Sequence, residues 1–302
     1  LLVQAAVTPL LGEGMVRFIK VLRQQRPPVY LAVYLCLATH ALLDGLTIYG
    51  TKLLWPLSME PYAVGSVFII DALYTLPLLV ATIWALCLPK WSRRMGTVIT
   101  AALVLSTAYQ AWCLAAQQIV TARAGEMLEQ AGVSAEKILA IPTPFNSYLW
   151  RVIVLDSERY LNLYIPVLGG REQITVYEHP RGRALATCLD GNPNLDKLAW
   201  FSRGYFRLDL HRGLRGDEVV FSDLRMGLTP NYAFRFAIAR HDAGGSQAIP
   251  PRHLGGPRGT WADVEWLLAN MGHDPVMRLA EAKAWLRTAD LSTTARSQAA
   301  VC

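Results

Sequence analysis

Charged residues are scarce in this chain. They make up 17% of its 302 residues, against roughly 25% in ordinary soluble domains. The deficit is confined to the first part of the chain: up to residue 120 the charges are few and clustered, whereas from residue 121 onward they are frequent and mixed. We therefore predict a membrane-embedded region over residues 1–120 and a water-soluble region behind it.

Several motifs that mark soluble enzymes are absent. No serine stands in the Gly-x-Ser-x-Gly setting of a nucleophile elbow, and no P-loop or dinucleotide fingerprint follows an expected strand. The five cysteines form no Cys-x-x-Cys pair, and three of them lie in apolar stretches. We therefore expect no disulfide framework and no cysteine zinc site, and we predict that the cysteines are small buried residues.

The net charge of +6 does not point to nucleic acid. Much of the basic excess lies in short clusters beside apolar segments, where it sets the orientation of membrane helices. No interleaving of aromatic and basic residues marks a base-stacking surface. The expected partners are membrane lipids, no nucleic-acid partner is expected, and the sequence specifies no protein partner.

Four apolar stretches follow one another in the membrane-embedded region. They cover residues 1–11, 29–49, 62–88 and 97–120. Because about 20 apolar residues cross a ~30 Å hydrocarbon core, we predict three to four membrane helices. Basic residues cluster between the first and second stretches and between the third and fourth. The positive-inside rule places both basic loops in the cytoplasm, so the water-soluble region is predicted to be periplasmic.

Three ionisable side chains within these stretches form the candidate site. His40 and Asp44 are four residues apart and share one face of a helix. Asp71 lies in the next, antiparallel stretch, at a similar depth if each residue advances ~1.5 Å. Ionisable residues in membrane helices are costly and mark functional sites, and imidazole and carboxylate groups bind Zn²⁺. We predict that His40, Asp44 and Asp71 bind a divalent metal ion, with zinc expected.

The same residues allow two other readings. Asp71 is either a metal ligand or a base that orients a metal-bound water, and Tyr74 is then the residue that steadies developing negative charge. Alternatively, the histidine and aspartates form a bridge that pins two helices together without any metal. Both readings remain open at the level of sequence.

The water-soluble region alternates between helical and strand patterns. Residues 121–242 are predicted to form a small α+β domain, rich in β-strands, that closes into an antiparallel sheet. Its histidines are expected in solvated turns, and its arginines are expected on the polar face of the sheet or on an anion-binding surface. The predicted helices are 121–140 and 195–203, and the predicted strands are 150–155, 160–167, 174–178, 206–210, 218–224 and 232–239.

The last part of the chain, residues 243–302, is predicted to combine a linker, two short helices and a flexible tail. Residues 243–260 are rich in glycine, proline and arginine and read as a linker. Thr260 can cap a helix over residues 261–271, a second amphipathic helix is predicted over 275–289, and the tail begins at residue 291.

Several sequence blocks resemble a known family. They read His-Ala-Leu-Leu-Asp-Gly-Leu-Thr-Ile-Tyr-Gly from His40 and Phe-Ile-Ile-Asp-Ala-Leu-Tyr-Thr from Phe68. On these blocks the chain resembles the YdjM-like family of inner-membrane, metal-dependent hydrolases. The resemblance continues in shorter blocks at residues 142–146, 149–152, 200–204 and 223–227.

The resemblance implies a multi-pass protein of the bacterial inner membrane with a metal site built from His and Asp. The family pattern also includes an Asp-rich turn and a His-Arg-Gly-x-Thr-His-Ser block ahead of the His-x-x-x-Asp helix, and neither occurs in this chain. We therefore expect an N-terminally truncated member, in which His40 and Asp44 match presumed ligands and Asp71 matches a motif position.

Two functions follow from these observations. The first is a membrane-bound metal-dependent hydrolase that uses a metal-activated water on an unknown substrate, such as a lipid or phosphoester. The second is a non-catalytic membrane anchor or scaffold that presents a soluble interaction domain. An ion-coupled transporter is disfavoured because there are only three or four spans and no internal repeat.

Overall fold

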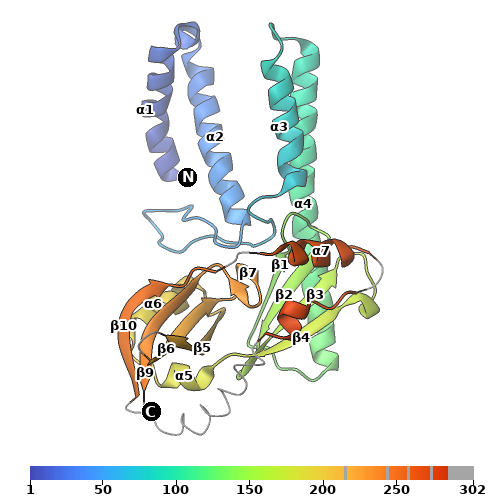
Figure 1. Ribbon diagram of the computed structural model, residues 1–302. Helices are drawn as coiled ribbons and strands as arrows, with labels where there is room; N and C mark the ends of the chain where they lie inside the picture. The colour runs from blue at the N-terminus through green and yellow to red at the C-terminus, as the bar shows by residue number, and fades with distance from the viewer. Residues whose placement is uncertain (214–215, 243–244, 257–258, 273–274, 285–302) are drawn as a thin grey trace. The chain divides into compact units, whose positions relative to one another are not determined.

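The chain folds into two compact units. The helical unit comprises residues 1–115 and 141–147, and the β-rich unit comprises residues 116–140 and the described residues from 148 onward. This division lies close to the boundary at residue 120 that the distribution of charge predicts. The computed structural model (Figure 1) describes residues 1–213, 216–242, 245–256, 259–272 and 275–284.

A pair of packed helices opens the helical unit. Helix α1 spans Leu2–Phe18 and α2 spans Arg26–Leu46, with a short 3-10 helix, Lys20–Gln24, between them. At Gly12 an added Cβ atom would lie 2.8 Å from the ring of Tyr30. The missing side chain therefore lets the tyrosine ring of α2 approach the backbone of α1 closely.

The third apolar stretch is only partly helical. Helix α3 spans Ala72–Leu86, so its 15 residues are fewer than the predicted stretch over 62–88. The residues before it run back to the end of α2, where the backbone N–H groups of Val64 and Ser66 donate to carbonyls of the last α2 turn at 2.9 Å each. This return satisfies carbonyls that the helix end leaves without intrahelical partners.

A tight turn makes this return possible at Gly50. Its φ of +65° lies in the left-handed region, and an added Cβ atom would collide with the carbonyl of Tyr62. Tyr62 itself pairs with Thr51 in an isolated antiparallel bridge. The backbone therefore requires glycine at this position.

The fourth apolar stretch continues far beyond its predicted end. Helix α4 spans Arg93–Gln130, which is 38 residues without a break. The separate helix predicted over 121–140 is therefore wrong: its first half belongs to α4, and its last residues begin a strand. No proline interrupts the helix, and it ends just before Gly132, which has a φ of +65°.

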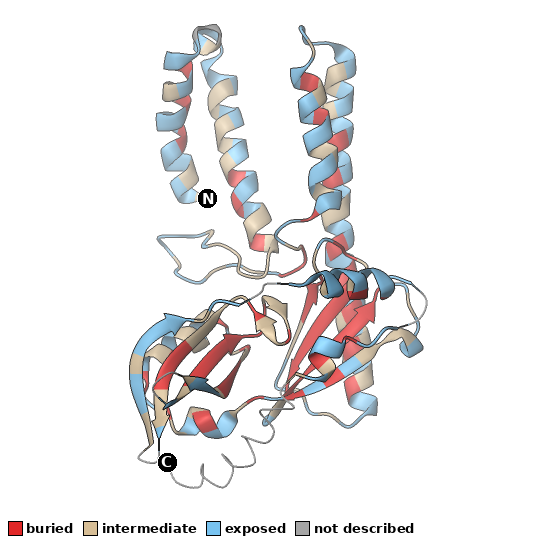
Figure 2. Ribbon diagram, in the orientation of Figure 1, coloured by how far each residue is buried: buried red, intermediate tan, exposed pale blue. Residues whose placement is uncertain are grey.

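Two helices in the described residues, α2 and α4, are long and apolar enough to cross a membrane. In their most apolar windows only 22% and 17% of the residues are buried within the structure. Figure 2 shows the exposed positions along all four helices of this unit. A core helix of a soluble protein is mostly buried, so the exposed apolar surfaces of α2 and α4 make them candidate membrane spans.

The β-rich unit contains two four-stranded sheets where the sequence predicts one. The first sheet has the strand order β1-β2-β3-β4 and the second has the order β10-β9-β6-β5, while β7 and β8 form a separate two-stranded ribbon. The bounds are β1 Lys137–Pro142, β2 Leu149–Leu155, β3 Arg159–Pro166, β4 Thr175–Pro180, β5 Phe206–Gly213, β6 Gly216–Asp223, β7 Gly227–Leu228, β8 Asn231–Tyr232, β9 Arg235–Asp242 and β10 Gly245–His253.

Each sheet has its own hydrophobic core. The end of α4 lies on the first sheet, with Ala116, Val120 and Ala124 fully buried against residues such as Trp150 and Val152. The second sheet packs against two short helices, α5 and α6, through leucines and Phe221. The helices are α5 Arg183–Thr187 and α6 Pro193–Phe201, and the chain continues to α7 Trp261–Ala269 and α8 Leu279–Ala282, with a 3-10 helix at Arg171–Gln173.

The predicted linker over 243–260 is wrong for much of its length. Residues Gly245–His253 form strand β10, which pairs antiparallel with β9. Its register shifts between Ala248 and Arg252, where Pro250 and Pro251 lack the N–H groups that a ladder needs. An edge strand tolerates prolines that a central strand does not, and β10 is the edge of its sheet.

Other local predictions have mixed outcomes. The Thr260 cap is confirmed as a capping box at the start of α7, and the helix predicted over 195–203 begins two residues earlier, at Pro193, after the N-cap Asn192. The helix predicted over 275–289 is described only as far as residue 284 and is helical only in α8, and the predicted tail lies outside the described residues. Cys113 is buried as predicted, but Cys36 and Cys87 are exposed and Cys188 is disulfide-bonded.

Candidate functional site

His40 and Asp44 form the exposed part of the predicted metal site. Both lie on α2, one turn apart, and the His40 Nε2 atom is 3.7 Å from the Asp44 Oδ2 atom. Their side chains are 75% and 45% exposed. The pair is therefore on one helix face, as the spacing predicts, and is open to a third group.

Asp71 has a different position from the one predicted. It is the N-cap of α3 rather than a residue inside a membrane helix. Its Oδ1 atom accepts hydrogen bonds from the backbone N–H groups of Leu73 at 3.0 Å and Tyr74 at 3.2 Å. A carboxylate in this position accepts hydrogen bonds from two N–H groups that the helix start leaves unpaired. Its negative charge is also stabilised by the positive end of the helix dipole.

The second oxygen of Asp71 connects α3 to α4. Its Oδ2 atom accepts a hydrogen bond from the Tyr109 hydroxyl at 2.8 Å, and the aspartate is 3% exposed. One turn away, the Ser106 hydroxyl donates to the backbone carbonyl of Tyr74 at 3.0 Å. Asp71 and Tyr74 thus take part in a polar tie between two apolar helices, and the Tyr74 contribution is made by its backbone.

Sequence reasoning did not identify Tyr109 and Ser106. They are three residues apart in a predicted membrane helix, where polar side chains need partners within the protein. That spacing places both side chains on one helix face, and it is the feature of the sequence that could have indicated a shared polar contact. The sequence does not say which group on another helix they meet.

The described residues do not complete a metal site. No group of three or more His, Cys, Asp or Glu side chains lies close enough together to hold an ion, within the ranges that the structure describes. A catalytic zinc site needs three protein ligands, whereas His40 and Asp44 supply two and both Asp71 oxygens accept hydrogen bonds from the protein. The metal site therefore stays a prediction, and His40 and Asp44 by themselves provide too few ligands for it.

A second set of ionisable residues lies inside the β-rich unit. Glu281 of α8 is fully buried, and its carboxylate accepts hydrogen bonds from Asn162 at 2.6 Å and Tyr164 at 2.7 Å. Its carboxylate also lies 3.1 Å from the His179 Nε2 atom and forms an ion pair with Arg278 at 3.4 Å. We call these five residues the Glu281 cluster.

The charge of Glu281 is stabilised by its donors. Burial acts to raise the pKa of the carboxyl, but the hydrogen bonds from His179, Tyr164 and Asn162 outweigh it, so the pKa is lowered from its usual value. The same burial raises the pKa of Tyr164 far above its usual value, and the nearby Glu281 charge adds to this. The tyrosine therefore stays a neutral donor to a charged acceptor.

Arg278 links the Glu281 cluster to α7. Its guanidinium forms an ion pair with Asp263 at 2.6 Å and donates to the carbonyl of Thr229, and its backbone N–H donates to the Tyr177 hydroxyl at 2.6 Å. Burial acts to raise the pKa of Asp263, but the hydrogen bonds from Arg278 and Thr260 together with the Arg278 charge outweigh it, so the pKa is lowered. Buried charges with this many partners hold α7 and α8 on the first sheet, which is a structural role.

The remaining predicted surface features of the β-rich unit are corrected by burial. His179 lies in strand β4 and is 4% exposed, so it is not in a solvated turn. Arg207 and Arg225 are 2% and 3% exposed and do not form the wet face of a sheet. Arg225 instead forms a close buried ion pair with Asp223 at 2.7 Å.

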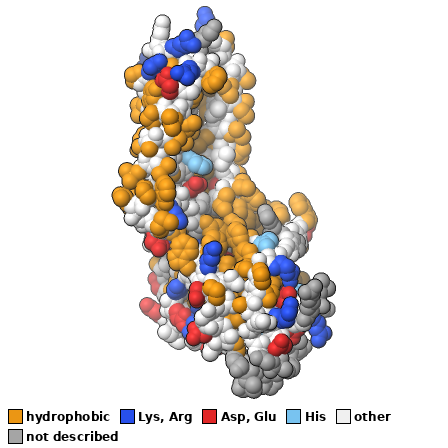
Figure 3. Space-filling model, turned by 90° about the vertical axis from the view of Figure 1, so that its left-hand side faces the viewer, with side chains coloured by type: hydrophobic (Ala, Val, Ile, Leu, Met, Phe, Trp, Pro, Cys, Tyr) orange, Lys and Arg blue, Asp and Glu red, His pale blue; other side chains and the backbone are white. Residues whose placement is uncertain are grey.

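The basic and apolar side chains of the helical unit are segregated. Figure 3 shows Lys and Arg side chains gathered at one end of this unit and hydrophobic side chains along the helices. The loop between α1 and α2 and the loop between α3 and α4 both lie at that end (Figure 1). This pattern is typical of a membrane protein with basic loops on one side.

Comparison with known proteins agrees with this pattern. The model of the YdjM inner membrane protein family matches residues 2–120, a range that includes the blocks at 40–50 and 68–75 and ends before those from 142 onward. Searches of curated proteins and of solved structures give no match. Residues 2–120 are therefore similar to the YdjM inner membrane proteins.

Proposed function

We propose that this protein is a membrane anchor that presents a folded β-rich domain at the surface of the inner membrane. One observation carries the proposal: α4 contains a membrane-length apolar window, and its last part supplies buried residues to the core of the first sheet. The helix that carries the candidate membrane span thus continues without a break into the core of the β-rich domain.

The Asp71 tie supports an anchoring role for the helical unit. Its oxygens accept hydrogen bonds from the α3 backbone and from Tyr109 of α4, so it holds two helices together through Tyr109, whereas the expected bridge was between the histidine and the aspartates. We propose that the β-rich domain lies on the periplasmic side, because the basic loops between helices favour the cytoplasm.

Membrane fractionation and a topology reporter test this proposal. The full chain is expected to stay in the membrane after extraction with alkaline carbonate. A C-terminal alkaline phosphatase fusion is expected to be active, because that enzyme folds only in the periplasm, and a matching green fluorescent protein fusion is expected to be dark. Release by carbonate would contradict the anchor, and the reverse fusion pattern would contradict the periplasmic location.

The second candidate function is a metal-dependent hydrolase. It is favoured by the exposed His40–Asp44 pair, which offers an imidazole and a carboxylate of the types that bind zinc. A third ligand is required, and the described residues do not provide it. Asp71 keeps its proposed catalytic role only if its hydrogen bond from Tyr109 of α4 opens.

Metal analysis separates the two candidates. If the protein is a hydrolase of this type, purified full chain contains zinc or another divalent ion, and His40→Ala or Asp44→Ala removes it. Asp242→Ala, an aspartate that the metal reading does not use, serves as the control and should leave metal content unchanged. Metal-free wild type, or equal metal content in all variants, contradicts the hydrolase and leaves the anchor.

A further inference from the structure

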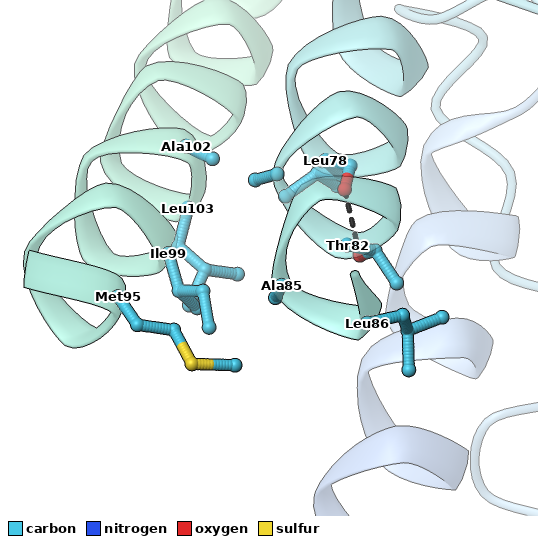
Figure 4. Close-up of a pocket in the computed structure, with 9 residues that line it drawn as sticks. Leu78, Thr82, Ala85, Leu86, Met95, Ile99, Ala102 and Leu103 are labelled. Atoms are coloured by element: carbon cyan, nitrogen blue, oxygen red, sulfur yellow. Dashed lines mark hydrogen bonds between the residues drawn. The ribbon is translucent and has the colours of Figure 1, made fainter. Parts of the chain in front are cut away.

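A groove lies between α3 and α4, next to the loop that joins them. It is lined by nine residues from the two helices and has a volume of about 230 Å³. Figure 4 shows Leu78 and Ala85 on one helix facing Ile99 and Leu103 on the other. We call this feature the α3–α4 groove.

The lining of the α3–α4 groove is apolar. Thr82 is the polar residue among the nine, and its hydroxyl donates to the Leu78 carbonyl at 2.7 Å, so its hydrogen bond is already made. Alanines at 81, 85 and 102 are buried along the groove, where their small side chains leave the space open. Such a groove offers a ligand van der Waals contact and no polar partner.

The dimensions of the groove fit part of one lipid. Its lining residues on α3 run from Leu78 to Leu86, which is about 12 Å at ~1.5 Å per residue. One leaflet contributes about half of a ~30 Å hydrocarbon core. The volume is also below the roughly 300–1,000 Å³ of sites that enclose a whole small molecule. A single acyl chain, lying along the helices within one leaflet, meets these limits.

Three basic side chains lie at the end of the groove where the α3–α4 loop begins and ends. Lys90, Arg93 and Arg94 lie in or beside the loop between α3 and α4, and all three are exposed. Within the described residues none of them forms an ion pair with a carboxylate. Trp91, between them, is 71% exposed, as is typical of an aromatic at the membrane interface.

We propose that the α3–α4 groove binds one acyl chain of an anionic phospholipid, whose phosphate is held by Lys90, Arg93 and Arg94. Basic pockets at the ends of membrane helices attract anionic head groups in this way. The inference rests on the membrane location in the proposed function, and it adds a specific lipid site to it. The bound lipid fills the space that the small alanines leave between the two helices.

Photo-crosslinking in lipid nanodiscs tests the proposal. Full chain is reconstituted with phosphatidylglycerol that carries a diazirine in one acyl chain, and in parallel with the same probe on phosphatidylcholine. After illumination, mass spectrometry maps the modified peptides. We expect crosslinks within residues 78–103 from phosphatidylglycerol and at least about tenfold fewer from phosphatidylcholine, since each basic residue adds roughly fivefold to binding of an anionic lipid.

Two matched pairs of variants control for position. Ala102→Leu fills the groove and should abolish these crosslinks, whereas Ala101→Leu, on the exposed side of the same helix, should keep them. Neutralising Lys90, Arg93 and Arg94 to glutamine should remove the preference for phosphatidylglycerol. The same change at Arg17, Arg23 and Arg26, in the other basic segment, should preserve it.

Three results would overturn the lipid site. They are equal crosslinking in Ala102→Leu and Ala101→Leu, equal crosslinking from both lipids, and a second copy of the chain crosslinked at the groove in place of lipid. If Ala102→Leu fails to reconstitute, the glutamine variants still decide the head-group preference. Release of the chain from membranes by carbonate is a separate result, which contradicts the anchor rather than the groove.

Discussion

Replacing Glu281 by glutamine removes one negative charge from the interior of the β-rich unit. The carboxylate is fully buried and accepts bonds from Asn162, Tyr164 and His179. Glutamine keeps the shape but introduces two N–H donors where donors already converge. The free energy of unfolding should therefore fall.

The size of this effect follows from the number of charged contacts. A hydrogen bond to a charged group contributes about 1.5–3 kcal/mol, and removing one partner of a buried ion pair costs about 3–5 kcal/mol. Because glutamine retains one acceptor oxygen, we expect the lower end, about 3 kcal/mol. For a domain of roughly 150–250 residues this lowers Tm by about 6–12 °C.

Glu178→Gln is the matched control. Glu178 also forms a short ion pair, with Arg159 at 2.8 Å, but its side chain is 58% exposed. Exposed pairs contribute only about 0–1 kcal/mol. Thermal unfolding of both variants in detergent, followed by near-ultraviolet circular dichroism, reports on the aromatic packing around Tyr164, whose ring centre is 4.9 Å from that of Trp266. Equal shifts in Tm for the two variants would refute the reasoning.

The stability of the β-rich unit should also depend on pH through the same residue. The folded pKa of Glu281 is lowered from its ordinary value of 4.5, so the unfolded chain binds the proton more readily. The stabilisation is therefore present above the ordinary glutamate pKa and is lost as the pH falls through the folded value. Wild type should lose stability in acid more steeply than Glu281→Gln, and parallel pH profiles from urea unfolding would contradict this.

Two further substitutions test the local interactions. Tyr109→Phe removes the hydrogen bond to Asp71 and should destabilise the contact between α3 and α4 by about 1.5–3 kcal/mol, which is measured as faster proteolysis in detergent. Tyr74→Phe should have little effect, because Tyr74 makes its contact through the backbone. Similar proteolysis rates for both variants would argue against the tie. Thr260→Ala removes the capping box of α7 and should cost about 0.5–2 kcal/mol, measured by the same thermal unfolding, and an unchanged Tm would show that the cap is dispensable.

Local signals in the sequence predicted several elements correctly. Thr260 followed three residues later by Asp263 is a capping pattern, and it starts α7 as expected. His40 and Asp44 lie on one face because the helical repeat requires it. These predictions succeed because the interacting groups are within one helical turn of each other.

Predictions that depend on the neighbours of a segment were less reliable. The prolines of β10 indicated a linker, and only the edge position of the strand makes them acceptable. Asp71 was placed inside a span because the preceding residues are apolar, yet these residues bond to the end of α2 and leave Asp71 to begin α3. Apolar composition alone does not distinguish a helix from an extended segment.

By itself the sequence determined that an apolar helical region precedes a mixed β-rich region, because hydrophobicity and charge are properties of composition. It also placed His40 next to Asp44. Only the tertiary structure decided the distant partners of Asp71 on α4 and of Glu281 on the first sheet, which lie 38 and more than 100 residues away along the chain. Such partners meet through the packing of whole helices and sheets, and that packing cannot be predicted from a short segment of sequence.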